Sequence, residues 1–107
     1  MTKKVYLWVD DERNHPLKGS TPPQGVMYIT TRSYQATVDF LGYCRDEHIE
    51  VLIDLDHDLG EEKTGYDICK FIIENEYPLL GFILHTMNPV GRQNMNQLLT
   101  HYGYTPF

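Results

Sequence analysis

The sequence predicts an α/β fold built on a short, largely buried parallel sheet. Two apolar runs, residues 5–9 and residues 51–55 with Asp54 as the one polar residue, have the length and composition of strands that are covered on both faces. Two further strand-like runs alternate with stretches whose apolar residues have helical spacing. Right-handed crossovers then favour about four strands in the order 2-1-3-4, with residues 5–9 and 51–55 at the centre.

The first half of the chain is expected to contain two strands, a loop and a helix. Residues 14–25 hold three prolines and two glycines, so a loop is expected after the first strand and not a full helix. Residues 26–31 follow as the second strand. Ser33 is suited to cap a helix, and the apolar residues after it form one stripe that should cover a sheet face: Tyr34, Val38, Leu41 and Cys44.

The second half repeats the alternation of strand and helix. The third strand covers residues 51–56, and a helix over about residues 66–75 ends before Pro78 and presents Ile68, Cys69, Ile72 and Ile73 inward. Residues 79–85 form the fourth strand. Asn88 and Pro89 then start a last helix that ends at Gly103 and carries an apolar stripe made of Met95, Leu98, Leu99 and Tyr102.

The C-terminal end of the sequence predicts an incomplete sheet. Only four residues follow Gly103, so we expect the fifth strand to be truncated or absent. The outer edge of the strand at residues 79–85 would then lack a partner. An unpaired edge of this kind favours a homodimer.

Composition predicts one cytoplasmic globular domain over residues 1–107. Hydrophobic residues make up 41% of the chain, and no apolar stretch has the length of a membrane helix. Cys44 and Cys69 are far apart and are expected to be small core residues. The net charge of −6 argues against binding long nucleic acid through a basic surface, but a short nucleotide or an RNA end remains open if a metal ion masks the carboxylates.

Polar clusters follow three of the four predicted strands. Asp10 and Asp11 end the first, Asp56-His57-Asp58 ends the third, and His85-Thr86 with Asn88 ends the fourth. Ligands of parallel sheets bind outside the carboxyl ends of the strands, so these groups should converge. Asp10, Asp11 and Asp56 would form an oxygen site suited to Mg²⁺ or another divalent cation. A solvated turn with a capping role is the alternative for Asp10 and Asp11.

The alternation of Asp54, Asp56 and Asp58 calls for a positive partner. Three carboxylates on one side of an extended backbone are costly to bury unless a cation accompanies them. The spacing also fits the start of an EF-hand calcium loop, but Gly65 stands where that loop needs its final glutamate, so we reject that interpretation.

Acid/base and phosphate-binding candidates stand beside these carboxylates. His57 and His85 would exchange protons near neutral pH, with Asp58 next to His57. The start of the last helix, which includes Thr86, Asn88, Gly91 and Arg92, offers N–H groups and a guanidinium to phosphate. Ordinary surface positions, with Asn88 only capping the helix, are the alternative for these residues. The remaining histidines, His15, His48 and His101, are expected at the surface.

Four motifs resemble one family. LWVDDER (7–13), LDHDLG (55–60), TGYD (64–67) and HTMNPVGRQNM (85–95) are similar to the cyclic-phosphate-processing receiver, a divergent response-regulator receiver domain. The resemblance implies a receiver-like, flavodoxin-like three-layer sandwich and a role on cyclic phosphates, in RNA end repair or nucleotide signalling. The matching positions are Asp10, Asp11, Asp56, His57, Asp58, His85, Asn88 and Arg92.

The leading interpretation is a metal-dependent, phosphoesterase-like domain that acts on a cyclic or terminal phosphate of a nucleotide or RNA end. One alternative is a non-catalytic receiver-like module that accepts a phosphoryl group or binds a partner. It ranks second because the sequence ends where a receiver's fifth strand, with its lysine, would begin. The other is a binder that sequesters a cyclic nucleotide through stacking Tyr and Trp side chains.

Overall fold

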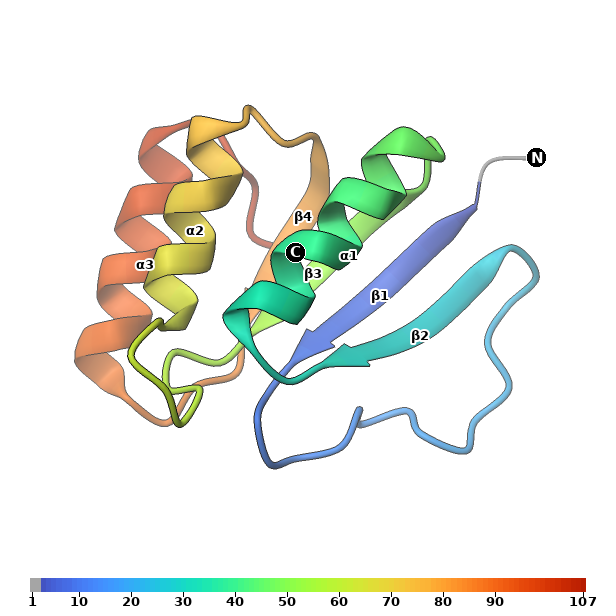
Figure 1. Cartoon of the computed structure of the whole chain (residues 1–107), viewed down its shortest axis with the longest axis horizontal. Helices are drawn as coiled ribbons and strands as arrows, with labels where there is room; N and C mark the ends of the chain where they lie inside the picture. The colour runs from blue at the N-terminus through green and yellow to red at the C-terminus, as the bar shows by residue number, and fades with distance from the viewer. Residues whose placement is uncertain (1–2) are drawn as a thin grey trace.

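A computed structural model describes residues 3–107, which form four strands and three helices (Figure 1). The strands are β1 (Lys4–Val9), β2 (Val26–Thr31), β3 (Glu50–Leu55) and β4 (Leu79–Leu84), and the helices are α1 (Tyr34–Asp46), α2 (Gly65–Glu74) and α3 (Pro89–His101). All strand pairs are parallel, in the order β2-β1-β3-β4. The predicted fold class and strand order are confirmed.

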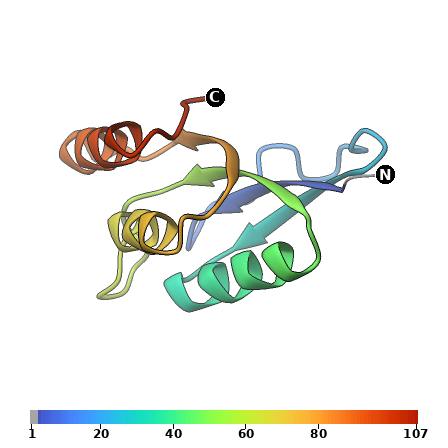
Figure 2. The same cartoon turned by 90° about the horizontal axis from the view of Figure 1, so that it is seen from above.

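The two faces of the sheet are covered differently. Helices α1 and α2 lie on one face, and the loop between β1 and β2 lies on the other (Figure 2). Helix α3 packs beside α2. The proline-rich loop therefore takes the place of a first helix, as predicted. None of the helices in residues 3–107 is both long and apolar enough to cross a bilayer.

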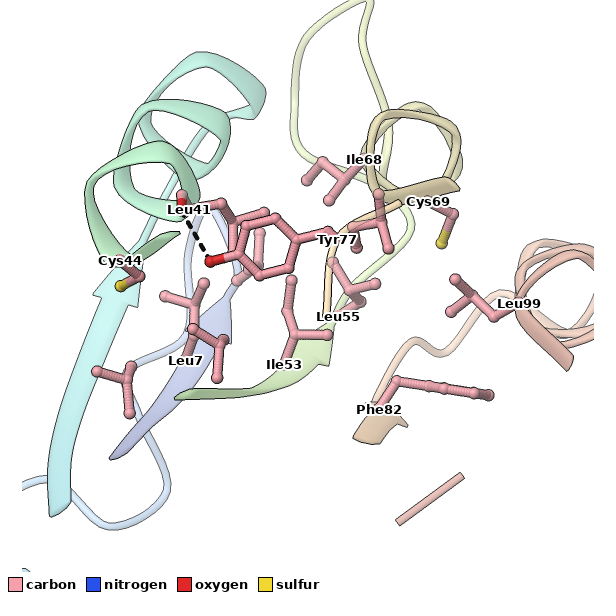
Figure 3. Packing of buried hydrophobic residues seen from close by; sticks show 14 of the residues in the cluster. Leu7, Leu41, Cys44, Ile53, Leu55, Ile68, Cys69, Tyr77, Phe82 and Leu99 are labelled. Atoms are coloured by element: carbon pink, nitrogen blue, oxygen red, sulfur yellow. Dashed lines mark hydrogen bonds between the residues drawn. The ribbon is translucent and has the colours of Figure 1, made fainter. Parts of the chain in front are cut away.

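The hydrophobic core lies between the sheet and the helices (Figure 3). Alternate residues of β1 and β3 face it, from Val5 to Val9 and from Val51 to Leu55, and each of these is at most 1% exposed. Tyr77 closes the core by donating a hydrogen bond to the Leu41 carbonyl at 2.8 Å. Cys44 and Cys69 are buried as predicted, and burial raises the pKa of these thiols to about 11 and about 12. Both are therefore inert core residues at neutral pH.

Local capping signals decide where the helices begin. The Ser33 hydroxyl accepts from the Ala36 N–H at 3.1 Å, and the Asn88 side chain accepts from the Gly91 N–H at 2.9 Å. Both caps are as predicted, and Pro89 occupies the first position of α3. Tyr102 was expected in the buried stripe of that helix, but this was wrong. It is 57% exposed because it follows the last turn.

The loop-covered face of the sheet contains a buried histidine. His15 was expected at the surface, and this was wrong, because the loop folds back and leaves the residue only 6% exposed. Its Nε2 pairs with the Tyr6 carbonyl at 3.2 Å, while its Nδ1 accepts from the Leu17 N–H at 3.1 Å. Burial lowers the pKa of His15, although the hydrogen bond to Tyr6 opposes that shift. The ring stacks on Tyr28 and anchors the loop on the sheet.

The C-terminal residues reach the free edge of β4. The Phe82 N–H donates to the Thr105 carbonyl at 3.1 Å, and the Phe107 N–H donates to the Phe82 carbonyl at 2.9 Å. Pro106 thus makes an isolated parallel bridge with Phe82. This single bridge is a truncated fifth strand, as predicted.

Candidate functional site

An acidic cleft lies where β1, β3 and β4 end. It has a volume of about 340 Å³ and is lined by Asp10, Asp11, Glu12, Arg13, Asp56, Asp58, Gly60, Thr86 and Met87. Parallel strands bring their carboxyl ends to one edge, which is why residues so far apart in the sequence meet there. Five predicted site residues line the cleft together: Asp10, Asp11, Asp56, Asp58 and Thr86.

The Asp10 carboxylate is held in the acidic cleft by several hydrogen bonds. It is 1% exposed, and its Oδ1 accepts from the N–H groups of Glu12 and Arg13 at 2.9 and 2.8 Å. Its Oδ2 pairs with Arg13 Nε at 2.9 Å and with His85 Nε2 at 3.0 Å. Burial alone would raise the pKa of Asp10, but these hydrogen bonds and the Arg13 charge outweigh it and lower that pKa. Asp10 is therefore held as a carboxylate.

His85 joins Asp10 to a second buried carboxylate. Its Nδ1 lies 2.7 Å from Asp54 Oδ1, and the Tyr6 hydroxyl donates to Asp54 Oδ2 at 2.7 Å. The imidazole stacks on Trp8 with ring centroids 3.6 Å apart. Each ring nitrogen faces a carboxylate oxygen, so both sides of the imidazole are held by hydrogen bonds. The ring does not line the acidic cleft formed by the described residues.

Arg13 spans the gap between Asp10 and Asp56. Its NH2 lies 3.6 Å from Asp56 Oδ2, while its Nε contacts Asp10. The other Asp56 oxygen accepts from the His57 N–H at 2.8 Å. Arg13 supplies positive charge of the kind that the run of aspartates calls for. The Arg13 side chain is 49% exposed, whereas that of Asp10 is 1% exposed.

His57 lies behind the cleft, against the start of α3. Its Nδ1 pairs with Asp58 Oδ1 at 3.0 Å and lies 3.5 Å from Asn88 Nδ2. The ring rests on Gly91, where an added Cβ would lie 2.5 Å from His57 Cγ. Among the described residues, Asp58 lines the acidic cleft and His57 does not. The hydrogen bond to Asp58 is therefore the contact that connects His57 to the cleft.

The remaining predicted residues support the loop between β4 and α3. Arg92 donates from NH2 to the Thr86 carbonyl at 2.7 Å, and the Thr86 hydroxyl accepts from the Asn88 N–H at 3.1 Å. Arg92 lines a neighbouring groove together with Thr86. In the described part of the chain, Asn88 and Gly91 line neither this groove nor the acidic cleft. Asp11 lies on the other side of the acidic cleft, with its carboxylate against Gly60.

Comparison with known proteins gives the family of the chain. The family model of the cyclic-phosphate processing receiver domain matches residues 5–101. The chain belongs to this family. No curated protein and no solved structure is similar enough to match. The predicted family is confirmed, and the domain is linked to cyclic-phosphate processing.

Among residues 3–107, this receiver domain has one group of side chains close enough together to hold a metal ion. Ligand atoms of Asp10, Asp56 and His85 all lie within 4.8 Å of one another. Receiver domains commonly bind Mg²⁺ through acidic residues. Two carboxylates fit that ion, which takes one or two of them and keeps several waters. His85 Nε2 already pairs with Asp10 Oδ2, which places the ring behind that carboxylate and not beside the ion.

Sequence reasoning missed part of the network behind this receiver's acidic cleft. Asp54 was recognised as one of three alternating aspartates but was not placed at the site. Tyr6 was assigned to a strand, and Trp8, the single tryptophan, was considered outside that strand only as a base-stacking side chain. Strand pairing could have placed Asp54 near the site, because Asp54 and Trp8 are register partners on neighbouring strands that end at the acidic cleft. Arg13 lies within the LWVDDER motif, yet nothing in the sequence shows which way its side chain turns.

Proposed function

We propose that this receiver domain is a divalent-metal-dependent phosphoesterase that acts on a cyclic or terminal phosphate of a nucleotide or RNA end. The observation that carries the proposal is the acidic cleft itself, where Asp10 and Asp56 flank the Arg13 guanidinium. The carboxylates suit a hard cation, and the guanidinium suits phosphate. The match to the cyclic-phosphate processing family supports this substrate class.

Mg²⁺ would be held by Asp10 and Asp56, with Asp11 in the same cleft. Such an ion neutralises phosphate charge and lowers the pKa of a bound water. His85 positions Asp10 through the hydrogen bond to its Oδ2. It thereby keeps that carboxylate oriented toward the cleft, as partners behind metal ligands do.

The side chains of the acidic cleft have separable roles in the proposed reaction. Arg13 orients the phosphate, and Thr86, fixed by Arg92 and Asn88, lines the wall beside it. Asp58 accepts the proton of the attacking water and is oriented by His57. Water would then add to phosphorus while one P–O ester bond breaks. The departing oxygen would take up a proton from solvent, and Asp58 would release the proton that it accepted back to solvent. A 2′,3′-cyclic phosphate would thus open to a phosphomonoester.

Arg13→Gln is expected to raise the affinity for Mg²⁺ by about tenfold, because the guanidinium competes with the cation for Asp10 and Asp56. Titration calorimetry of the purified protein with MgCl₂ measures this change. Arg45→Gln is the matched control, since it removes an equal charge from the end of α1, where the side chain bonds the Asn75 carbonyl. Unchanged or weaker Mg²⁺ binding by Arg13→Gln would show that the two cations do not share a site.

Asp58→Asn is expected to slow opening of a 2′,3′-cyclic phosphate by about 10² or more, the usual effect of losing a positioned acid or base, while the substrate still binds. Phosphorus NMR of a cyclic mononucleotide and of an RNA end, with Mg²⁺ present, measures turnover. Glu12→Gln is the control, because it removes a carboxylate from the same cleft that does not pair with His57.

The same assay separates the rival functions. Tight binding by the wild type with every candidate substrate left intact would replace the enzyme by a binder that sequesters a cyclic nucleotide. Incorporation of phosphate at Asp56 from acetyl phosphate would instead support a receiver that accepts a phosphoryl group. Asp56 is the carboxylate considered for this reaction because it follows β3 and lines the acidic cleft.

A further inference from the structure

A second cleft lies under the proline-rich loop and differs in charge from the first. It has a volume of about 430 Å³ and is lined by the loop, by β2 and by the residue after β2. The lining includes Asn14, His15, Lys18, Ser20, Tyr28 and Arg32. Lys18 and Arg32 are its charged residues, and no carboxylate lines it within residues 3–107. In a chain of net charge −6, such a basic cleft attracts anions.

The two basic side chains of this cleft keep their charge available. Neither Lys18 nor Arg32 is within ion-pairing distance of a carboxylate in the described part of the chain. Arg32 instead donates to neutral oxygens, from NH2 to Asn14 Oδ1 at 2.7 Å and from NH1 to the carbonyl of Arg13 at 3.2 Å. The guanidinium is thus held in place without being neutralised.

Arg32 also connects the basic cleft to the acidic cleft. Its NH1 donates to the Asp10 carbonyl at 3.1 Å, and the side chains of Asp10 and Arg13 line the acidic cleft. Asn14, the next residue along the chain, lines the basic cleft. A single molecule that reaches from one cleft to the other would therefore pass along residues 10–14.

The loop that carries Lys18 is fixed before any ligand arrives. The Lys18 N–H donates to the His15 carbonyl at 3.0 Å, and the Ser20 N–H donates to the Leu17 carbonyl at 3.0 Å. His15 secures this turn to β1 through the Tyr6 carbonyl. A preformed turn loses little conformational entropy when an anion binds.

We infer that the basic cleft binds a second phosphate of the substrate, namely the phosphodiester next to the cyclic phosphate in the acidic cleft. This inference rests on the proposed function and narrows it to substrates with at least two phosphates. The physical reason is charge, because a nucleotide substrate offers the phosphodiester of its neighbour as its next anionic group. The domain would then prefer an RNA end or a dinucleotide to a cyclic mononucleotide.

The test compares a mononucleotide 2′,3′-cyclic phosphate with a dinucleotide that ends in the same group. The wild type should bind the dinucleotide more tightly, and Lys18→Gln should reduce that preference roughly fivefold, as expected for one partly exposed ionic contact. Lys70→Gln is the matched control, because it removes the same charge from α2, where Lys70 pairs with Asp67. Raising the salt concentration should weaken the preference in the wild type.

A third probe separates failure of this inference from failure of the proposed function. A dinucleoside monophosphate has the phosphodiester but no terminal phosphate, and its binding is followed by ¹⁵N NMR shifts of the Lys18, Gly19 and Ser20 amides. Shifts there support the basic cleft even if no cyclic phosphate binds. The inference is overturned if the protein binds the mononucleotide and the dinucleotide with equal affinity, or if none of the probes shifts these amides. Turnover of the mononucleotide would still support the proposed function in that case.

Discussion

Asp54→Ala is expected to lower the free energy of unfolding by about 3 to 5 kcal/mol, because the Tyr6 hydroxyl and one His85 ring nitrogen lose their hydrogen-bond partner, at about 1 to 3 kcal/mol each. Asp54 is 2% exposed and accepts from both the His85 ring and the Tyr6 hydroxyl. Its loss would leave the Tyr6 hydroxyl and His85 Nδ1 without these partners beside the Trp8 ring. Equilibrium unfolding in urea at neutral pH measures the difference.

Asp58→Ala is the matched control for this prediction. It is the same substitution on the same segment, but the Asp58 side chain is 67% exposed, so its stability should change by no more than about 0.5 kcal/mol. The two variants separate a structural carboxylate from one that faces the cleft. Equal urea midpoints for Asp54→Ala and Asp58→Ala would mean that the Asp54–His85 pair contributes little to the folded state.

The elements that the sequence predicted correctly are those set by local signals. Ser33 caps α1 and Asn88 with Pro89 starts α3 because capping depends on a few adjacent residues. The apolar runs placed β1 and β3 at the centre of the sheet, and the parallel topology placed their acidic tips at one edge. Fold and cleft position therefore followed from pattern alone.

The parts that could not be predicted depend on side-chain direction and on how a loop folds. His85 points back between two carboxylates and stacks on Trp8, which no spacing rule specifies. His15 is buried because an irregular loop turns over the sheet, although a lone histidine in a polar segment usually stays in solvent. His57 and His85 were predicted as an acid/base pair because both follow the ends of strands. The position of a residue at a strand end does not determine where its ring points, and neither ring lines the acidic cleft.

Gly65→Ala is expected to destabilise the protein by about 3 kcal/mol, at the upper end of the usual cost of overpacking. Gly65 is the first residue of α2, and its N–H donates to the His57 carbonyl at 2.8 Å. A Cβ at this position would overlap the Asp56 carbonyl oxygen and lie 3.1 Å from Met95 Sδ. A backbone carbonyl cannot swing aside, so the start of α2 or the segment that carries Asp56 and His57 must shift.

Gly42→Ala supplies a control with the opposite sign. Gly42 lies inside α1 with nothing within 4 Å of its added Cβ, so the same substitution should stabilise the protein by about 0.5 to 1 kcal/mol through helix propensity. Urea unfolding of both variants gives the two free energies, and ¹⁵N NMR shows whether the Asp56 and His57 amides move in Gly65→Ala. Wild-type stability with unmoved amides would mean that α2 does not approach the acidic cleft as closely as the structure has it. The expected result is instead a loss of stability and of cleft geometry together, because α2 packs directly on the backbone of Asp56.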